Sequence, residues 1–345
     1  MAESQLLAME ARQVDELPSG PGWQYEPKWD GFRCLAIRRG KTVELLGRSG
    51  KSLSRYFPEI IEQLADLRAP RFILDGELAI PQDKALSFDA LQMRLHPAAS
   101  RIRRLAAETP AILIVFDLLQ AADGRDLASA TLSERRQELQ RFFAARDLPR
   151  SLVLSPATTR RAEASRWLRR AGGGALDGVV AKRIDEPYRG GERAMLKIKC
   201  LRTADCVVGG FRYGSGSRTV GSLLLGLFNE KGLLDHVGFT SAIAEQDKPA
   251  LTAKLEKLRG APGFTGDAPG GPSRWSTERS AQWEPLKTRL VAEVQYDHVT
   301  GHRFRHGTRL MRWRPDKAPR DCTFEQLRLE SRPSVLLRRL SNAAR

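Results

Sequence analysis

The 345-residue sequence has only four cysteines, and none of them forms a C-x-x-C pair. This is too few for a disulfide framework in a chain of this length, so we expect reduced thiols in a reducing compartment. No apolar run approaches the roughly 18 residues that a membrane-spanning helix needs. The N-terminus carries acidic residues and no basic segment before an apolar core, so we expect no secretory signal. We therefore expect a cytoplasmic protein with no membrane partner.

The common nucleotide-binding loops are also missing. The glycines at 214, 216 and 221 do not fit G-x-G-x-x-G, because position 219 is threonine, and no G-x-x-x-x-G-K-[ST] segment occurs. These absences exclude dinucleotide-binding Rossmann folds and P-loop folds. No internal repeat is visible either, so the architecture has to be inferred from local patterns.

The sequence has fewer acidic than basic residues. The chain has 41 Asp and Glu residues against 57 Lys and Arg residues, a net charge of +16. A basic face gains affinity for nucleic acid by releasing counterions from the phosphate backbone. Charge therefore favours a nucleic-acid partner over a membrane surface, and it leaves open a generally basic, solvated exterior. The 41% apolar and 28% charged residues are typical of a folded globular chain.

The pattern of apolar residues changes along the chain. Up to about residue 200, short apolar strands alternate with helical segments: strands are predicted over 43–46, 72–78, 111–119, 152–154 and 178–182, and helices over 58–67, 133–145 and 161–171. After about Thr203, short strands broken by glycine follow, with one helical segment over 246–259. We expect one domain over residues 1–202, a small barrel of the oligonucleotide-binding kind over 203–330, and a basic tail over 331–345.

The most informative segment is Glu26-Pro27-Lys28-Trp29-Asp30-Gly31-Phe32-Arg33. A lysine is a nucleophile only when neutral, and its ordinary pKa near 10.4 leaves about one in a few thousand deprotonated at neutral pH. Nearby cations or burial would have to lower the pKa of Lys28, and the candidates are Lys197, Lys199, Lys182 and Arg33. Taken alone, the segment is equally compatible with a surface turn around Asp30-Gly31.

Further segments with chemical potential follow in order along the chain. They are Gly47-Arg48-Ser49-Gly50, Leu74-Asp75-Gly76-Glu77, Val115-Phe116-Asp117, Asp177-Gly178-Val179-Val180-Ala181-Lys182, Leu196-Lys197-Ile198-Lys199 and Arg312-Trp313-Arg314-Pro315-Asp316-Lys317. An arginine in a glycine-flanked turn suits a phosphate, and two carboxylate motifs are expected at strand ends. Two lysines separated by one residue share a face of an extended segment.

This ordered series resembles the covalent nucleotidyltransferases and, within them, the ATP-dependent DNA ligases, most closely the compact bacterial C-type ligases. The resemblance runs from about Glu26 to Lys317. It implies an α+β fold, in which a nucleotidyltransferase (adenylation) domain with mixed and antiparallel sheets and flanking helices precedes an all-β oligonucleotide-binding (OB) barrel. It also implies a monomer in the bacterial cytoplasm, at the nucleoid, that uses ATP and Mg²⁺ or Mn²⁺ to seal nicks in duplex DNA, with DNA repair as its role and repair proteins as partners.

The resemblance implies a role for each matching residue. Lys28 would attack the α-phosphate of ATP to form a lysyl-AMP, with pyrophosphate as leaving group. Contacts with the nucleotide would come from Glu26, Arg33, Glu77, Phe116, Lys182, Lys197 and Lys199. Glu77 and Asp177 would lie near Mg²⁺, although many ligases carry glutamate in place of Asp177. Arg48 would meet the 5′-phosphate of DNA, and Arg212 and Arg218 would lie near its backbone. After closure of the second domain, pyrophosphate would be oriented by Arg312, Arg314, Asp316 and Lys317.

Two other functions stay open at this point. RNA ligases and mRNA-capping guanylyltransferases share the lysine motif, so the nucleotide donor and the acceptor have to be distinguished by experiment. A catalytically inactive DNA-binding relative would keep the fold and form no covalent AMP. The presence of the lysine, the motif carboxylates and the paired lysines disfavours the inactive relative.

Overall fold

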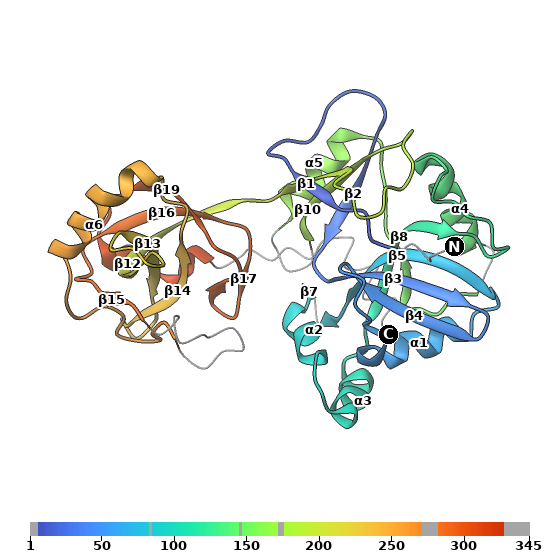
Figure 1. Ribbon diagram of the computed structural model, residues 1–345, viewed down its shortest axis with the longest axis horizontal. Helices are drawn as coiled ribbons and strands as arrows, with labels where there is room; N and C mark the ends of the chain where they lie inside the picture. The colour runs from blue at the N-terminus through green and yellow to red at the C-terminus, as the bar shows by residue number, and fades with distance from the viewer. Residues whose placement is uncertain (1–5, 83–84, 145–146, 172–175, 271–281, 328–345) are drawn as a thin grey trace. The chain divides into compact units, whose positions relative to one another are not determined.

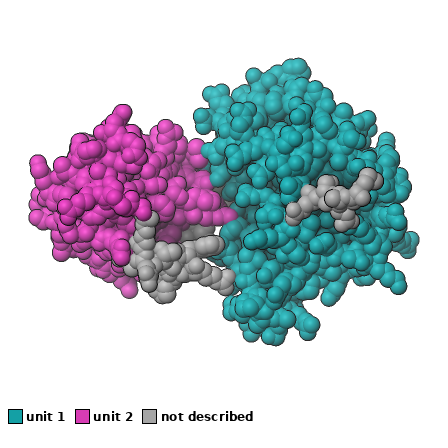
Figure 2. Space-filling view, viewed as in Figure 1, with its two compact units in different colours: residues 1–200, 331–345 teal, residues 201–330 magenta. Residues whose placement is uncertain are grey.

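The computed structural model describes residues 6–82, 85–144, 147–171, 176–270 and 282–327. The chain divides into two compact units with the division between Cys200 and Leu201, and Figure 2 colours them separately. We call the part up to Cys200 unit 1 and the part from Leu201 to Glu330 unit 2, and each is described by itself. The basic tail expected over 331–345 lies outside the described residues.

The larger sheet of unit 1 has five strands in the order β4–β3–β5–β8–β9 (Figure 1). Their bounds are Phe32–Arg39 for β3, Thr42–Gly47 for β4, Arg71–Ala79 for β5, Ile112–Gln120 for β8 and Leu152–Leu154 for β9. The pairs are antiparallel except β8 with β9, which is parallel. Strand β8 is buried along nearly its whole length, which explains its mostly apolar sequence, interrupted by Asp117.

A second sheet of unit 1 has four strands in the order β1–β11–β10–β2. They are β1 (Ala11–Gln13), β2 (Trp23–Trp29), β10 (Leu176–Arg183) and β11 (Met195–Lys199). Strand β2 ends at Trp29 and β3 begins at Phe32, so Asp30 and Gly31 connect the two sheets. The short pair β6 (Pro81–Gln82) and β7 (Ala85–Leu86) follows β5.

Helices cover parts of both sheets. Helix α1 (Pro58–Ala65) starts with proline and packs near β4, burying Ile60 and Leu64. Helix α4 (Leu132–Ala144) packs against β8, and Thr131 and Glu134 exchange hydrogen bonds at its start in the manner of a capping box. Helix α5 (Arg161–Arg169) packs against β2 and β10. The remaining helices of this unit are η1 (Ser54–Tyr56), α2 (Phe88–Arg94) and α3 (Ala99–Glu108).

Unit 2 is built mainly from strands. Its sheet has the order β14–β13–β12–β16–β19, and β15 also pairs with β12. The strands are β12 (Arg202–Tyr213), β13 (Val220–Phe228), β14 (Leu234–Thr240), β15 (Glu284–Pro285), β16 (Val291–Tyr296) and β19 (Arg309–Trp313). A separate pair is formed by β17 (Val299–Thr300) and β18 (Arg303–Phe304). The helical segments are η2 (Glu245–Asp247), α6 (Lys248–Lys257), η3 (Pro319–Asp321) and η4 (Phe324–Leu327).

The predicted α+β composition is confirmed, with three differences in detail. The motifs that contain Asp75 and Asp117 lie inside β5 and β8 rather than at the ends of these strands. Helices α2 and α3 were not predicted, because one is short and the other has few apolar residues. Lys28 lies within β2, so only the Asp30-Gly31 part of its motif is a turn. Among the described residues, no helix is long and apolar enough to cross a membrane.

The connection between β2 and β3 depends on glycine at position 31. A methyl group there would overlap the carbonyl oxygen of Leu78 and lie 2.8 Å from the Cγ atom of Glu77. We expect Gly31→Ala to lower the free energy of unfolding by about 2–4 kcal/mol, measured by urea denaturation. Gly47→Ala is the matched control, because its methyl group would make contacts no shorter than 3.4 Å. An equal effect of the two substitutions would contradict the packing argument.

Candidate functional site

Unit 1 contains a cavity of about 380 Å³ that is lined by strands of both sheets. Eight residues that the sequence analysis singled out line it together: Glu26, Lys28, Arg33, Arg48, Glu77, Phe116, Lys182 and Lys197. They come from segments that are up to about 170 residues apart in the chain. The fold therefore gathers the ordered motifs of unit 1 around one space.

Lys28 forms an ion pair at the wall of this cavity. Its Nζ atom lies 2.7 Å from Oδ2 of Asp177, and both side chains are mostly buried. Strand β2 pairs with β10, where Lys28 is opposite Gly178 and Trp29 is opposite Leu176, so the ladder has an irregularity at Asp177. Such a bulge redirects a side chain, and here Asp177 faces Lys28.

The ion pair determines the protonation of Lys28. Burial is the largest single influence and opposes the charged amine, but Asp177 together with Glu77 and Asp30 outweighs it and raises the pKa of Lys28 above its ordinary value. The prediction that neighbouring cations lower this pKa is therefore wrong in this structure. The pKa of Lys197 is lowered instead, first by burial and then by the charges of Lys199, Lys28, Arg48 and Arg193.

A second buried ion pair connects the same two strands, β2 and β10. Lys182 Nζ is 2.9 Å from Glu26 Oε2, and Gln24 donates a 2.7 Å hydrogen bond to the other oxygen of Glu26. All three side chains are almost fully buried. The Lys182 amine also lies 4.7 Å from the centre of the Phe116 ring. This corner offers a polar edge and an aromatic ring, which suits a nucleobase.

Arg33 and Glu77 form the part of the wall that comes from β3 and β5, where they are opposite each other. Arg33 donates two hydrogen bonds of 2.6 Å to the fully buried carboxylate of Asp75, and its guanidinium lies 4.6 Å from the Phe116 ring centre. Burial raises the pKa of Glu77 to about 7, although Lys28 and Arg33 act in the opposite direction. Asp75 was not predicted as a site residue, although it lies in the motif that contains Glu77.

Glu77 and Asp177 fit a divalent cation. Both carboxylates act electrostatically on Lys28, so both lie near its amine. Carboxylate oxygens are the ligands that Mg²⁺ and Mn²⁺ prefer. Burial raises the pKa of Glu77, and a divalent cation beside this carboxylate would favour its charged form.

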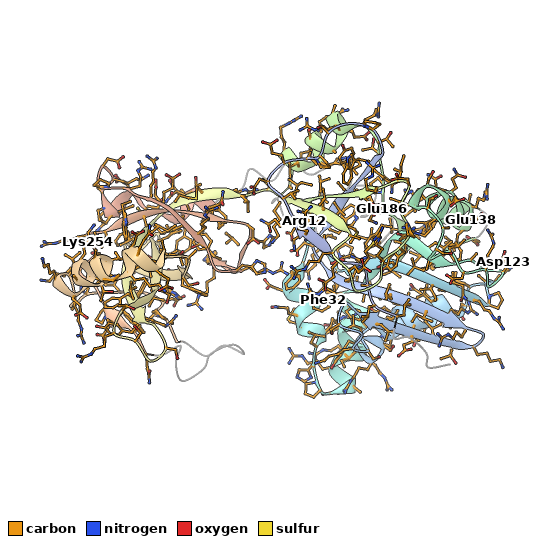
Figure 3. All side chains as sticks on the ribbon, turned by 45° about the horizontal axis from the view of Figure 1, so that its top comes forward. Arg12, Phe32, Asp123, Glu138, Glu186 and Lys254 are labelled. Atoms are coloured by element: carbon orange, nitrogen blue, oxygen red, sulfur yellow. The ribbon has the colours of Figure 1, made fainter. Side chains whose placement is uncertain are left out.

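More cationic side chains line the cavity than the sequence motifs predicted. Arg48 lies in the turn after β4, and Lys197 lies on β11, as expected. Arg12 on β1 and Arg193 before β11 line the same space, and Figure 3 labels Arg12. Neither arginine was predicted as a residue of the site, because neither belongs to a recognisable sequence motif and β1 is only three residues long.

Lys199 lies at the end of β11 in unit 1 and, like Asp177, is not among the residues that line the cavity. The other predicted residues belong to unit 2. Arg314 donates from Nη1 to both carboxylate oxygens of Asp205 at 3.0 Å and from Nη2 to Asp316 at 2.8 Å. Lys317 lies 3.2 Å from Asp205. The Arg314 side chain lowers the pKa of Asp316 to about 2. Arg312 on β19 pairs with Glu293 at 2.5 Å. Arg212 lies on β12 and Arg218 in the turn that follows it.

Comparison with known proteins matches both units. Residues 5–199 fit the model described as the ATP dependent DNA ligase domain, and residues 216–317 fit the ATP dependent DNA ligase C terminal region. The chain is 42% identical over 334 residues to DNA ligase C2 of Mycolicibacterium smegmatis, covering 92% of this chain and 93% of that protein. It is 41% identical over 334 residues to DNA ligase C of Mycobacterium tuberculosis, covering 92% of each chain.

A solved structure agrees with these matches. It is described as mycobacterial DNA ligase D complexed with ATP and MES, with 28% identity, a TM-score of 0.50, and coverage of 94% of this chain and 99% of that chain. The similarities confirm the resemblance found from the motifs. They also confirm the predicted fold class, an adenylation domain followed by an oligonucleotide-binding domain.

The raised pKa of Glu77 has a consequence for stability. Because the folded chain binds this proton more tightly than the unfolded chain, stability falls as pH rises from the ordinary pKa of 4.5 to about 7. We expect Glu77→Gln, in metal-free buffer, to be more stable than wild type by about 1–2 kcal/mol at pH 8 and by much less at pH 5, measured by urea denaturation. Glu44→Gln, an exposed substitution on β4, serves as control and should show no such pH-dependent difference. A constant difference between Glu77→Gln and wild type would contradict the assignment.

Proposed function

Because this chain belongs to the family of ATP-dependent DNA ligases, we propose that it seals nicks in duplex DNA through a covalent lysyl-AMP. Lys28 first takes AMP from ATP, the AMP then moves to the 5′-phosphate at the nick, and the 3′-hydroxyl finally displaces AMP and closes the strand. The observation that carries the proposal is the position of Lys28 in one cavity with the aromatic ring of Phe116, the buried carboxylate of Glu26 and further cations such as Arg48 and Lys197.

The first step forms a bond between Lys28 Nζ and the α-phosphorus and breaks the bond to pyrophosphate. Lys28 has to lose its proton first, and the ion pair with Asp177 opposes this loss. Asp177 and Glu77 would hold Mg²⁺ or Mn²⁺, which supplies positive charge for the phosphate oxygens. With its pairing to Asp177 broken, Lys28 would release its proton to water, and the neutral amine would act as the nucleophile.

The cavity offers separate surfaces for the parts of ATP. The Glu26 and Lys182 pair and the Phe116 ring form the surface for adenine, and Arg33 and Glu77 form the surface for the ribose. The α-phosphate would be bound by Lys197 and Lys199, both on β11. Arg48 remains for the 5′-phosphate of the nicked strand, because a guanidinium in an exposed turn can bind a phosphate through two hydrogen bonds.

Unit 2 would act at two stages. In the first step, Arg312, Arg314, Asp316 and Lys317 would orient pyrophosphate, and the pairing of Arg314 with Asp205 and Asp316 would hold its guanidinium in one orientation. Later, Arg212 and Arg218 would contact the DNA backbone. The alternation requires the domains to change their arrangement around the connection near residues 200–205.

The physiological setting is part of the proposal. The chain would work as a monomer at the bacterial nucleoid, on nicks that arise in DNA repair, alongside repair proteins that prepare the ends. The net charge of +16 supports binding to duplex DNA, because phosphate contacts dominate the affinity of such proteins.

Lys28→Ala and Lys28→Arg should both abolish the covalent adduct. Alanine lacks a nucleophile, and arginine keeps the charge without a neutral amine at working pH. The measurement is the intact mass after incubation with ATP and Mg²⁺ and added pyrophosphatase, in which wild type gains one AMP. GTP in place of ATP tests the guanylyltransferase alternative.

Lys41→Ala is the matched control for this experiment, because Lys41 is an exposed lysine in the turn between β3 and β4. It should form the adduct at the wild-type rate. An adduct on either Lys28 variant would contradict the assignment of the nucleophile. A wild-type chain that forms no adduct and still binds DNA would instead support the inactive relative.

The role of unit 2 predicts a step-specific defect. Lys317→Ala should slow adduct formation by about 100-fold, because one cation for pyrophosphate is lost. It should seal a nick that already carries AMP on its 5′-phosphate within about threefold of the wild-type rate. Lys231→Ala, an exposed substitution in the same unit, should change neither rate. An equal loss in both steps would rule out a role confined to the first step.

A further inference from the structure

The hydroxyl of Tyr188 joins three segments of unit 1 behind the cavity. It donates a 2.7 Å hydrogen bond to Oδ2 of Asp75 and accepts a 2.8 Å hydrogen bond from the backbone amide of Met9. Tyr188 is 8% exposed, and Asp75 is fully buried. The residue lies in the loop after β10, more than 100 positions from Asp75 in the chain. None of the proposed catalytic roles includes Tyr188.

The bond to Asp75 completes the pairing of a buried carboxylate. Oδ1 of Asp75 accepts from Nε of Arg33, and Oδ2 accepts both from Nη2 of Arg33 and from Tyr188. A buried carboxylate is tolerated only when its oxygens have hydrogen-bond donors. The two partners approach Asp75 from different segments, so they fix the rotation of its carboxylate plane.

Asp75 in turn orients Arg33. The guanidinium is planar, and two of its nitrogens are engaged by Asp75, so its third nitrogen is aimed by the orientation of this carboxylate. Arg33 lines the cavity next to Phe116, with the guanidinium 4.6 Å from the ring centre. A rotation of Asp75 would therefore move the part of Arg33 that meets a ligand.

The backbone around Tyr188 is firmly held. Its amide donates to Ala128 O at 2.9 Å, and the amide of Gly191 donates to Ala8 O at 3.2 Å. Glu10 N donates to Glu192 O at 2.7 Å, so the N-terminal segment and the loop after β10 bind each other on both sides of Met9. Met9 itself lines the cavity. These hydrogen bonds hold the Tyr188 hydroxyl in one position relative to the residues that line the cavity.

We propose that Tyr188 is a positioning residue for nucleotide binding: its hydroxyl, held by the Met9 amide, sets the orientation of Asp75 and through it the orientation of Arg33 toward the ribose of ATP. The inference rests on the proposed function, because it concerns the first step of that reaction. It predicts an effect on nucleotide affinity rather than on the chemistry at Lys28. It also predicts that the effect passes through Arg33 alone.

The test is Tyr188→Phe, which removes one oxygen atom and keeps the ring. The rate of lysyl-AMP formation is measured against ATP concentration, and the sealing of a nick that already carries AMP is measured separately. We expect the KM for ATP to rise about fivefold to tenfold, with the saturated rate within about twofold of wild type. Sealing of the adenylated nick should also stay within about twofold of wild type.

The matched control is Tyr25→Phe. The Tyr25 hydroxyl is buried in the same unit and donates a 2.8 Å hydrogen bond to Pro18 O, away from the Arg33 network. It should lower stability in a similar way and leave the KM for ATP within about twofold of wild type. A rise in KM of the same size in both variants would show a general structural effect and overturn the inference.

A second variant tests the connection through Arg33. In an Arg33→Ala background, Tyr188→Phe should raise the KM for ATP by less than about twofold, since the residue through which it acts is gone. Independent, multiplicative effects would overturn the inference. So would an unchanged KM in Tyr188→Phe when wild type forms the adduct, and this result would leave the proposed function intact. A wild-type chain without any adduct would refute the proposed function and the inference together.

Discussion

The compensation of buried charge is the constraint on which this site depends. The cavity needs cations for a polyanionic nucleotide, and a cation held away from water is costly unless a carboxylate accompanies it. Among the described residues, three largely buried cations of the site have such a carboxylate: Lys28 with Asp177, Arg33 with Asp75, and Lys182 with Glu26. Each pair compensates buried charge in the wall of the site. A nucleotide that enters has to leave a pair intact or separate its two partners.

The strand ladders bring these pairs together. Glu26 and Lys28 are two positions apart on β2, so they share a face, and β10 supplies Lys182 and Asp177 as their partners. The ion pair of Asp75 and the ion pair of Asp177 have different consequences for the reaction. Asp75 is closed off by Arg33 and Tyr188, which suits a lasting role in orientation, whereas Asp177 holds an amine that has to be released before it can react.

Much of the fold and the membership of the site could be predicted from sequence. Strands β5 and β8 are apolar runs interrupted by motif residues such as Asp75 and Asp117. The resemblance carried by the order of the motifs assigned their residues to one nucleotide site, and eight of these residues line one cavity. The protonation of Lys28 could not be predicted, since its decisive partner lies 149 residues away and spacing does not report which charge lies closest. The contact between Tyr188 and Met9 could not be predicted either, because a buried tyrosine outside any motif looks like an ordinary core residue. The roles of the individual site residues stay predictions.

The central claim is that AMP bound to the chain is an intermediate that is consumed in sealing a nick. The most direct measurement starts from the isolated AMP-bound chain, freed of ATP, and adds an excess of nicked duplex DNA with a 5′-phosphate and Mg²⁺. The account predicts that each AMP lost from the protein appears as free AMP together with one sealed strand. Loss of AMP without sealing, or an adduct that persists in the presence of the nick, would contradict it.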